Sequence, residues 1–318
     1  FMNHLENITP RRNRWYWYLL VLGLSFIMAN VVGSIPLVVL IVATSIQSGD
    51  ANAAVAISKG DITAAGVDSN LYLASMMFVF AVFLFSMIFL VRKIQGRTWP
   101  QVVNGTSRVR WRRVLAGIAV WGGLNVLLLA ASLIISPEDY EFRFDASQFV
   151  WLVIISLVMI PLQTTCEEYC VRGYLAQGIG AWTRNRWAVL AITSVAFGLM
   201  HGANPEVDEY GYGIMMAQYI SMGVILGLVT LLDDGIEIAM GIHAANNIFA
   251  SVFITFKGSV LPTAALFMAK DINPVIDFIS VVVYGAVAVV IFARLYGWRF
   301  GVMNERIALR NYDVPQAE

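Results

Sequence analysis

The chain has 318 residues, of which 58% are hydrophobic and 13% are charged. Soluble domains carry about a quarter charged residues, and the mean hydropathy here is +0.70, so an ordinary soluble domain is excluded. The formal net charge is +0, which gives no electrostatic reason to expect a nucleic-acid partner. We therefore expect an all-α polytopic membrane protein that is surrounded by the lipid bilayer and binds no nucleic acid.

Eight apolar segments are candidates for membrane-spanning helices, which need about 20 residues each. The first is too long for one upright helix and contains Gly33 and Pro36, so we expect it to cross once while tilted or broken there. The expected spans are Trp15–Ile46, Leu71–Val91, Val114–Ser136, Phe149–Leu162 continuing toward Gln177, Trp187–His201, Gly213–Leu232, Ile236–Phe256 and Val275–Leu295.

Basic residues are divided unevenly between the two sides that these spans define. With the N-terminus in the cytoplasm, 17 of the 21 Lys and Arg residues fall on the cytoplasmic side. Cytoplasmic loops carry such an excess, so both termini are expected there, in a multi-pass protein of the inner (cytoplasmic) membrane. The expected parts are a cytoplasmic tail (2–14), a three-helix part (15–136), a helical core (149–256), a last span (275–295) and a second cytoplasmic tail (296–318).

Ionisable side chains inside the spans are few, and each is a candidate for function. Placing such a group in a bilayer costs about 2.5–3.5 kcal/mol even on the gentler insertion scale. The candidates singled out here lie in the expected helical core. The set comprises Glu167, Glu168, Arg172, His201 and His243, with Asn246 and Asn247 as polar neighbours.

Helix geometry separates the two adjacent glutamates. Glu168 and Arg172 are four residues apart and lie on one face, where they can form an ion pair. Glu167 points about 100° away from Glu168, so it faces something else and is available as a general base. A purely structural interpretation, in which both glutamates join helices through Arg172, stays open.

The two histidines within the core each belong to a short helical pattern. In Phe197–His201 the aromatic ring and the imidazole share a face, and a histidine at a helix end often has only a structural role. In His243–Asn247 two hydrogen-bond donors lie on one stripe, where both can reach a single oxygen atom. That is the geometry of an oxyanion hole built from side chains. Asn246 points elsewhere and is expected to make a packing hydrogen bond.

A metal site is the alternative use of these groups. Glu167, His201 and His243 could together hold zinc, as in sites with two histidines and one carboxylate. No HExxH pattern is present, and the partner one turn from His243 is an asparagine, which is a good hydrogen-bond donor and a poor zinc ligand. We expect no required cofactor and keep catalytic zinc as the alternative. Cys166 and Cys170 have carboxylate neighbours and are expected to be packing residues.

The three patterns together resemble one family, the CAAX protease and bacteriocin-processing group, also called Abi, which includes the type II CAAX prenyl endopeptidases. Its pattern is EExxxR, then FxxxH, then HxxxN, on successive helices. Here these are Glu167-Glu168-Tyr169-Cys170-Val171-Arg172, Phe197-Gly198-Leu199-Met200-His201 and His243-Ala244-Ala245-Asn246-Asn247. The match covers about residues 149–256, and the first three spans show nothing specific to the family.

The resemblance implies an intramembrane endopeptidase acting on a membrane-associated peptide or protein. Carried over, it makes Glu167 the general base and His201 the group that assists and orients the water. His243 and Asn247 are implied to bind the developing oxyanion. Glu168, Arg172 and Phe197 are implied to support these four. The family is often labelled a metalloprotease, so the resemblance leaves the zinc question open.

Two other function classes remain, together with one geometric difficulty. A proton-coupled transporter could use Glu167 and the histidines as a relay, although no inverted repeat is visible. A catalytically inactive scaffold of the same family could keep the motifs. The difficulty is depth: at 1.5 Å per residue, the expected spans place Glu167 near the cytoplasmic face and His201 about 20 Å above it. We expect a tilted or displaced helix to bring them into a cavity that opens to the cytoplasmic half.

Overall fold

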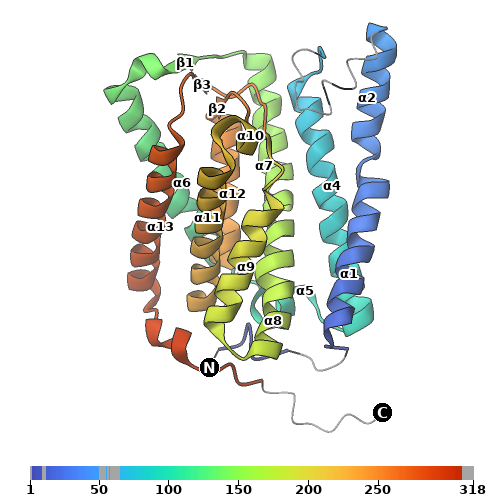
Figure 1. Ribbon diagram of the computed structural model, residues 1–318, viewed down its shortest axis with the longest axis vertical. Coiled ribbons are helices and arrows are strands. Elements are labelled where there is room, and N and C mark those ends of the chain that lie inside the picture. Colours follow the sequence, from blue (N-terminus) through green and yellow to red (C-terminus); the bar gives the residue numbers. More distant parts are fainter. Residues whose placement is uncertain (1, 9–11, 50–54, 56, 58–64, 310–318) are drawn as a thin grey trace.

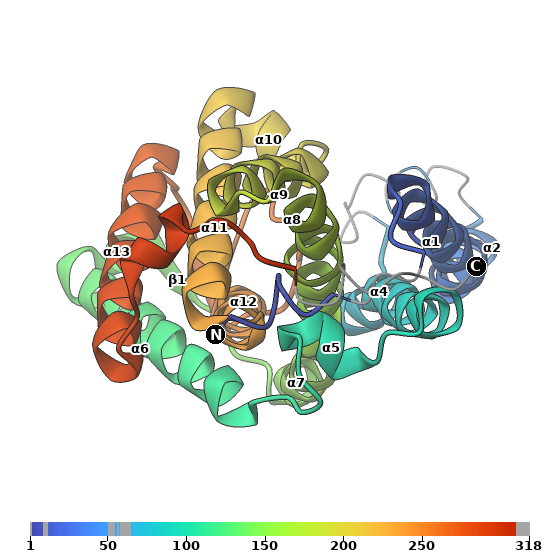
Figure 2. The same cartoon turned by 90° about the horizontal axis from the view of Figure 1, so that it is seen from below.

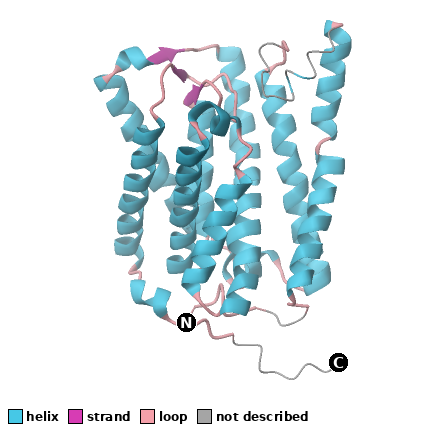
Figure 3. Cartoon of the chain, in the orientation of Figure 1, coloured by secondary structure: helices cyan, strands magenta, loops and turns pink. Residues whose placement is uncertain are grey.

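The structure is a computed structural model that describes residues 2–8, 12–49, 55, 57 and 65–309. Its long helices stand side by side along the longest axis (Figure 1). The all-α prediction is confirmed, since strands are confined to one end of the bundle (Figure 3). The α-helices are α1 (Trp15–Met28), α2 (Ile35–Ser48), α4 (Ser69–Leu90), α5 (Trp99–Asn104), α6 (Trp111–Ile135), α7 (Ala146–Glu168), α8 (Ala176–Thr183), α9 (Arg186–Met200), α10 (Pro205–Tyr210), α11 (Tyr212–Asp233), α12 (Glu237–Val252) and α13 (Pro274–Tyr296).

Short irregular helices connect or extend these elements. The π-helical turns are η1 (Ala29–Gly33), η2 (Val91–Gln95) and η4 (Tyr169–Leu175), and the 3₁₀ turns are η3 (Pro137–Asp139) and η5 (Phe300–Asn304). The turn η1 lies between α1 and α2, where the sequence predicts a break near Gly33 and Pro36. Helices α1 and α2 nevertheless form one continuous segment of 34 residues, as expected for a single crossing.

Among the described residues, six helical segments are long and apolar enough to cross a membrane. They correspond to six of the eight expected spans. The other two are α9, with 15 residues, and α12, with 16 residues. Both are shorter than a typical span and lie beside longer helices (Figures 1 and 2). The chain is therefore an integral multi-pass membrane protein whose central helices include two short ones.

The helix that carries the two glutamates is longer than expected. Helix α7, η4 and α8 follow one another without interruption over residues 146–183, although Pro161 lies inside α7. Glu167 is therefore about 24 Å above the end of this rod at Thr183, at about 1.5 Å per residue. His201 lies at the upper end of α9, about 22 Å above Arg186 on the same scale. With this longer helical segment, Glu167 and His201 lie at similar depths, so the difference that the shorter expected span implied disappears.

Helix α12 lies in the middle of the bundle, in contact with α6, α7 and α11 (Figure 2). Its approach to α6 depends on two glycines, Gly117 and Gly241. A Cβ atom at either position would collide with the backbone of the other helix. This close packing fixes α12 against α6. Helix α12 also packs against α7, and this second contact brings His243 next to the glutamates.

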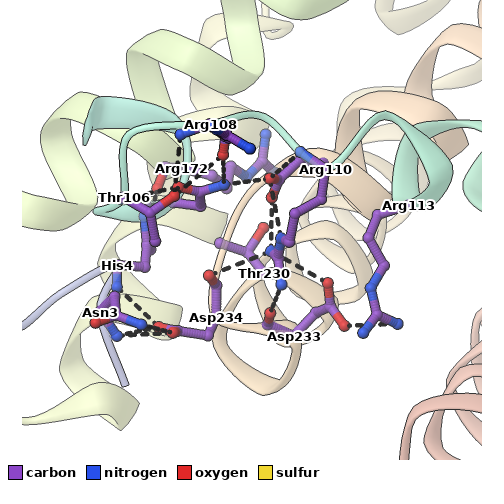
Figure 4. A network of polar contacts seen from close by, with 12 residues as sticks. Asn3, His4, Thr106, Arg108, Arg110, Arg113, Arg172, Thr230, Asp233 and Asp234 are labelled. Atoms are coloured by element: carbon purple, nitrogen blue, oxygen red, sulfur yellow. Dashed lines mark hydrogen bonds and ion pairs between the residues drawn. The ribbon is translucent and has the colours of Figure 1, made fainter. Parts of the chain in front are cut away.

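A polar network fixes the turn from α11 into α12 (Figure 4). Arg110, just before α6, forms ion pairs with Glu237 at 2.6 Å and with Asp233 at 3.3 Å. Arg113, in the first turn of α6, contacts Asp233 at 3.4 Å. Asp233 and Glu237 are buried. Because partners are needed for buried charges, the network holds the start of α12 in one position.

The N-terminal segment packs against this network and does not extend freely from the bundle. The backbone N–H groups of Asn3 and His4 donate to the Asp234 carboxylate at 2.7–2.8 Å. The His4 side chain is buried, and its Nε2 lies 2.9 Å from the carbonyl oxygen of Arg172. The first residues therefore pack against the lower end of the helical segment that carries the glutamates.

A small sheet lies at the opposite end of the bundle, in the strand order β1-β3-β2. Strand β1 (Tyr140–Phe142) pairs antiparallel with β3 (Phe267–Ala269), and Tyr140 is opposite Ala269. Strand β2 (Ile254–Phe256) pairs parallel with β3, and Ile254 is opposite Phe267. The sheet joins the α6–α7 connection to the α12–α13 connection, and so links the upper ends of these helices.

Candidate active site

The three sequence patterns meet in one buried cluster. Glu167 and Glu168 end α7, Arg172 lies in the π-helical turn η4, His201 follows the last residue of α9, and His243 lies in α12. All are buried except His201, whose side chain is 18% exposed. π-helical turns are rare in proteins overall, and those that occur are often found at functional sites. The expected convergence of the groups is thus confirmed, whereas the opening of a cavity toward the cytoplasm stays a prediction.

Glu168 and Arg172 form the predicted ion pair. Arg172 Nη1 donates to Glu168 Oε1 at 2.9 Å, and both side chains are buried. Arg172 Nη2 donates to the carbonyl of Gly223 in α11 at 3.3 Å. The guanidinium also lies 4.0 Å above the ring of Phe197. One arginine therefore connects α7, α9 and α11.

Glu167 faces the two histidines, away from Arg172. Its Oε2 atom is 3.9 Å from His201 Nε2 and 3.7 Å from His243 Nε2. This oxygen is buried and has no hydrogen-bond partner among the described residues. A direct N–H···O bond is at most about 3.2 Å long, so neither histidine bonds the carboxylate directly. Both separations are longer than a direct hydrogen bond and lie in the range above 3.5 Å at which an intervening water molecule is considered.

Hydrogen bonds at Nδ1 determine which face each imidazole presents to Glu167. His201 Nδ1 lies 2.8 Å from the carbonyl oxygen of Phe197, and His243 Nδ1 lies 2.8 Å from Glu168 Oε1. Both oxygens are acceptors, so Nδ1 carries the proton in each ring. In a neutral imidazole, Nε2 is then a bare acceptor directed at Glu167 Oε2.

Aromatic rings hold the imidazoles in place. The ring centroid of Phe197 is 4.5 Å from that of His201 and 5.6 Å from that of His243. Tyr219 of α11 also stacks on His201, with ring centroids 4.8 Å apart. The Phe197–His201 pattern therefore supplies a ring that contacts both histidines and a carbonyl that orients one of them. The sequence analysis did not identify Tyr219, because its position in an apolar helix carries no motif.

Asn247 lies one turn beyond His243 and reaches the cluster through another side chain. Its Nδ2 donates to Gln163 Oε1 at 3.1 Å, and Gln163 Nε2 donates to Glu167 Oε1 at 2.5 Å. Asn246 makes packing hydrogen bonds, as predicted, to Asn247 and Trp121. Gln163 was not predicted, although it is a polar residue four positions before Glu167 within an apolar span, and that spacing is a usable signal.

The donor set bears on the zinc alternative. Two imidazole nitrogens and one carboxylate oxygen point toward one another, which is the chemical composition of a known class of zinc site. Within the described part of the chain, no group of three or more His, Cys, Asp or Glu side chains has a geometry that would hold a metal ion. Cys166 and Cys170 are buried free cysteines. Their side chains pack in the core cluster around Tyr169, as expected.

Comparison with known proteins agrees with these patterns. Residues 146–249 match the family model of type II CAAX prenyl endopeptidase Rce1-like proteins. YyaK of Bacillus subtilis (strain 168), described as an uncharacterised protein, is 34% identical over 194 residues. That similarity covers 60% of this chain and 63% of YyaK, so the chain spans less than two thirds of this relative's length. No solved structure matches the chain.

The matched segment begins with α7 and ends within α12, so it contains all three motifs together with Gln163 and Tyr219. With Glu167-Glu168-xxx-Arg172, Phe197-xxx-His201 and His243-xxx-Asn247 in order on packed helices, residues 146–249 of the chain are similar to the Rce1-like, type II CAAX prenyl endopeptidase proteins.

Proposed function

We propose that this protein is an intramembrane endopeptidase that hydrolyses a peptide bond of a membrane-associated substrate. The observation that supports it best is the position of Glu167 Oε2, which is buried, lacks a hydrogen-bond partner among the described residues and faces two imidazole nitrogens at 3.7 and 3.9 Å. A water molecule there would donate one hydrogen to the carboxylate and the other to His201 Nε2. Such a water is oriented and activated for attack.

The proposed reaction uses four side chains. The water oxygen attacks the scissile carbonyl carbon while Glu167 takes its proton. His201 Nε2 accepts a hydrogen bond from the second hydrogen, which stays on the water oxygen, and this bond fixes the direction of attack. Glu167 then delivers the proton to the leaving nitrogen as the C–N bond breaks, which yields a carboxylic acid and an amine. His243 and Asn247 stabilise the oxyanion that exists between these steps.

His243 can act as an oxyanion donor only as an imidazolium. Its Nδ1–H is already donated to Glu168, so a hydrogen at Nε2 requires a second proton. In that form the cluster contains two carboxylates, Arg172 and one imidazolium, and its net charge is zero. A buried cluster of balanced charge is far less costly than one with an excess charge. Glu168 and Arg172 are therefore proposed to support the site electrostatically.

No cofactor is required by this mechanism. Should the protein bind zinc, the same Glu167, His201 and His243 would hold it, and the metal would supply a polarised water. The distinction is experimental: metal content and chelator sensitivity of the purified protein separate the two mechanisms.

The orientation in the membrane is part of the proposal. We infer eight crossings, with α9 and α12 as the two short ones, and both termini in the cytoplasm of a cell whose cytoplasmic membrane holds the protein. The 17 basic residues predicted on the cytoplasmic side support this orientation through the positive-inside bias.

The test compares the wild-type protein with the Glu167→Gln variant in liposomes. The first probe is a fluorogenic peptide that ends in a farnesylated Cys-aliphatic-aliphatic-X sequence. The second is membranes from cells that lack the protein, in which new peptide N-termini are counted by mass spectrometry. We expect cleavage by the wild type and none by the folded variant. Equal sets of N-termini for both proteins would refute the peptidase, and Glu167-dependent proton-coupled uptake would indicate a transporter instead.

A further inference from the structure

Four hydrogen bonds join five side chains into a chain that ends at Glu167. Trp121 Nε1 donates to Asn246 Oδ1, Asn246 Nδ2 to Asn247 Oδ1, and Asn247 Nδ2 to Gln163 Oε1, each at 3.1 Å. Gln163 Nε2 then donates to Glu167 Oε1 at 2.5 Å. The five residues come from α6, α12 and α7, so this series of hydrogen bonds links three helices that are distant in sequence.

The two ends of this chain determine its direction. An indole nitrogen is only a donor, and an ionised carboxylate is only an acceptor. Each amide between them must therefore turn its oxygen toward Trp121 and its NH₂ group toward Glu167. Reversing any single amide would place two donors or two acceptors against each other, and at least partly buried groups would lose their hydrogen-bond partners.

This direction has two consequences for the catalytic groups. Gln163 donates a hydrogen bond to Oε1 of Glu167, and the other oxygen, Oε2, faces both imidazoles. Asn246 donates a hydrogen bond to Oδ1 of Asn247, so the amide of Asn247 presents its NH₂ group to the site. One amide hydrogen of Asn247 is donated to Gln163, and the second is left for an oxyanion.

We propose that Trp121, Asn246 and Gln163 are positioning residues, and that this directional amide relay sets the orientation of Glu167 and Asn247. The inference rests on the proposed peptidase function. None of the three touches the reacting atoms in the proposed mechanism; they act through the two residues that do. Trp121 is almost fully buried, so its indole also fills space in the core, and the experiment must separate the two roles.

Two substitutions remove hydrogen bonds while largely retaining volume: Gln163→Leu and Trp121→Phe. The matched control is Ser156→Ala. Ser156 Oγ lies 3.0 Å from Ser251 Oγ in a buried hydrogen bond, which also joins α7 to α12 but does not belong to the relay. All variants, the Gln163→Leu/Trp121→Phe double variant and Glu167→Gln are measured in liposomes with the two probes named above, together with their thermal unfolding midpoints.

For Gln163→Leu we expect kcat to fall about 10- to 100-fold with KM changed less than about twofold, because misplacement of a reacting group affects the transition state more than binding. Trp121→Phe should lower kcat by a smaller factor, about 2- to 10-fold, since it frees the amides to reverse. The double variant should resemble Gln163→Leu alone, because members of one unit are not additive. Ser156→Ala should retain wild-type kcat.

The outcomes separate this inference from the function on which it rests. If the wild type cleaves no more than Glu167→Gln, both fail. If the wild type cleaves and Gln163→Leu keeps its kcat, the relay is refuted and the peptidase stands. A double variant whose loss is the product of the single losses refutes the relay as a unit. A loss of activity in Ser156→Ala equal to that in the relay variants, at matched unfolding midpoints, shows general packing and also refutes it.

Discussion

Oε1 of Glu168 lies 2.8 Å from Nδ1 of His243, and the same oxygen accepts a hydrogen bond from Arg172 at 2.9 Å. Glu168 is therefore shared between a permanent cation on its own helix and an imidazole on α12. The second glutamate of the pair thus contacts the proposed oxyanion donor and a buried cation. Glu167 has neither of these contacts, and its Oε2 faces both imidazoles at 3.7 and 3.9 Å. The two adjacent carboxylates therefore have different partners, and the proposed function gives them different roles.

The two glutamates should respond differently to the same change. Glu168→Gln leaves the Arg172 guanidinium buried without its anion, and breaking a buried pair costs about 3–5 kcal/mol. Glu167→Gln removes no contact with lysine or arginine, so its unfolding midpoint should stay within a few degrees of wild type while cleavage is lost. Thermal unfolding in detergent, monitored by tryptophan fluorescence, checks this. Similar midpoints for both variants would contradict the division of roles.

Phe197 should matter for stability as well as activity. Its ring lies 4.0 Å from the Arg172 guanidinium and contacts both imidazoles. Phe197→Leu removes a desolvated cation–π contact worth about 2 kcal/mol while it keeps an apolar side chain. We expect a lower unfolding midpoint and a fall in kcat of about tenfold. As a control, Phe249→Leu alters an aromatic residue of α12 that stacks on Phe253 and, among the described residues, has no ring contact with a histidine.

Docking of the N-terminal segment should depend on pH. Burial lowers the pKa of His4 below its ordinary value of 6.5, although the carboxylates of Asp234 and Glu237 act in the opposite direction and Arg110 adds to the lowering. The undocked segment then binds a proton more readily than the docked one. Docking is therefore at full strength above about pH 6.5 and weakens as the pH falls through the window between the ordinary and the lowered pKa.

Hydrogen exchange over residues 2–8 measures this effect, after correction for the intrinsic rates. Exchange should be faster at pH 5.5 than at pH 7.5 in the wild type. His4→Gln keeps a donor for the Arg172 carbonyl but does not titrate, so its exchange should be nearly independent of pH. A wild-type segment with equal protection at both pH values would contradict the prediction.

Metal removal should leave the peptidase active. The proposed reaction uses only carboxylate, imidazole and amide groups, so dialysis against a strong zinc chelator is expected to change kcat by less than about twofold. Elemental analysis of the purified protein gives the matching stoichiometry. Loss of activity with the chelator, restored by stoichiometric zinc, would instead assign Glu167, His201 and His243 as metal ligands.

Single cysteines test the orientation of the bundle. Lys257 follows β2 at the upper end and Arg299 precedes η5 at the lower end, and their side chains are 82% and 83% exposed. Both native cysteines are buried. With an impermeant maleimide added to intact cells, Lys257→Cys should be labelled and Arg299→Cys should be labelled only after permeabilisation. The reverse pattern would invert the proposed topology.

Much of this protein could be predicted before any tertiary contact was known, because the bilayer imposes simple rules. Only helices satisfy their backbone hydrogen bonds within one segment, so apolar length predicts the spans. Charged residues are costly in lipid, so the few inside the core marked the candidate site. The Glu168–Arg172 pair followed from the four-residue spacing alone, and the break near Gly33 and Pro36 followed from local composition.

Other features depended on how the helices pack. Nothing in the segment after Gln177 predicted that the rod would continue to Thr183, and this continuation is what raises Glu167 to the depth of His201. The partners of Glu168 and Glu167 on α12, and the indole of Trp121 on α6, are separated from them by dozens of residues. Such long-range contacts depend on which helix faces approach, here set in part by Gly117 and Gly241.

The sequence by itself therefore determined the class of protein, the approximate spans, the three motifs and the helical faces of their side chains, since each depends on spacing along one helix. Only the tertiary structure decided that Glu167 faces two imidazoles, that Glu168 is shared with His243, and that an amide chain reaches Glu167 from Trp121. The physical reason is that these relationships join side chains on different helices, whose relative depth and rotation are set by packing and not by periodicity.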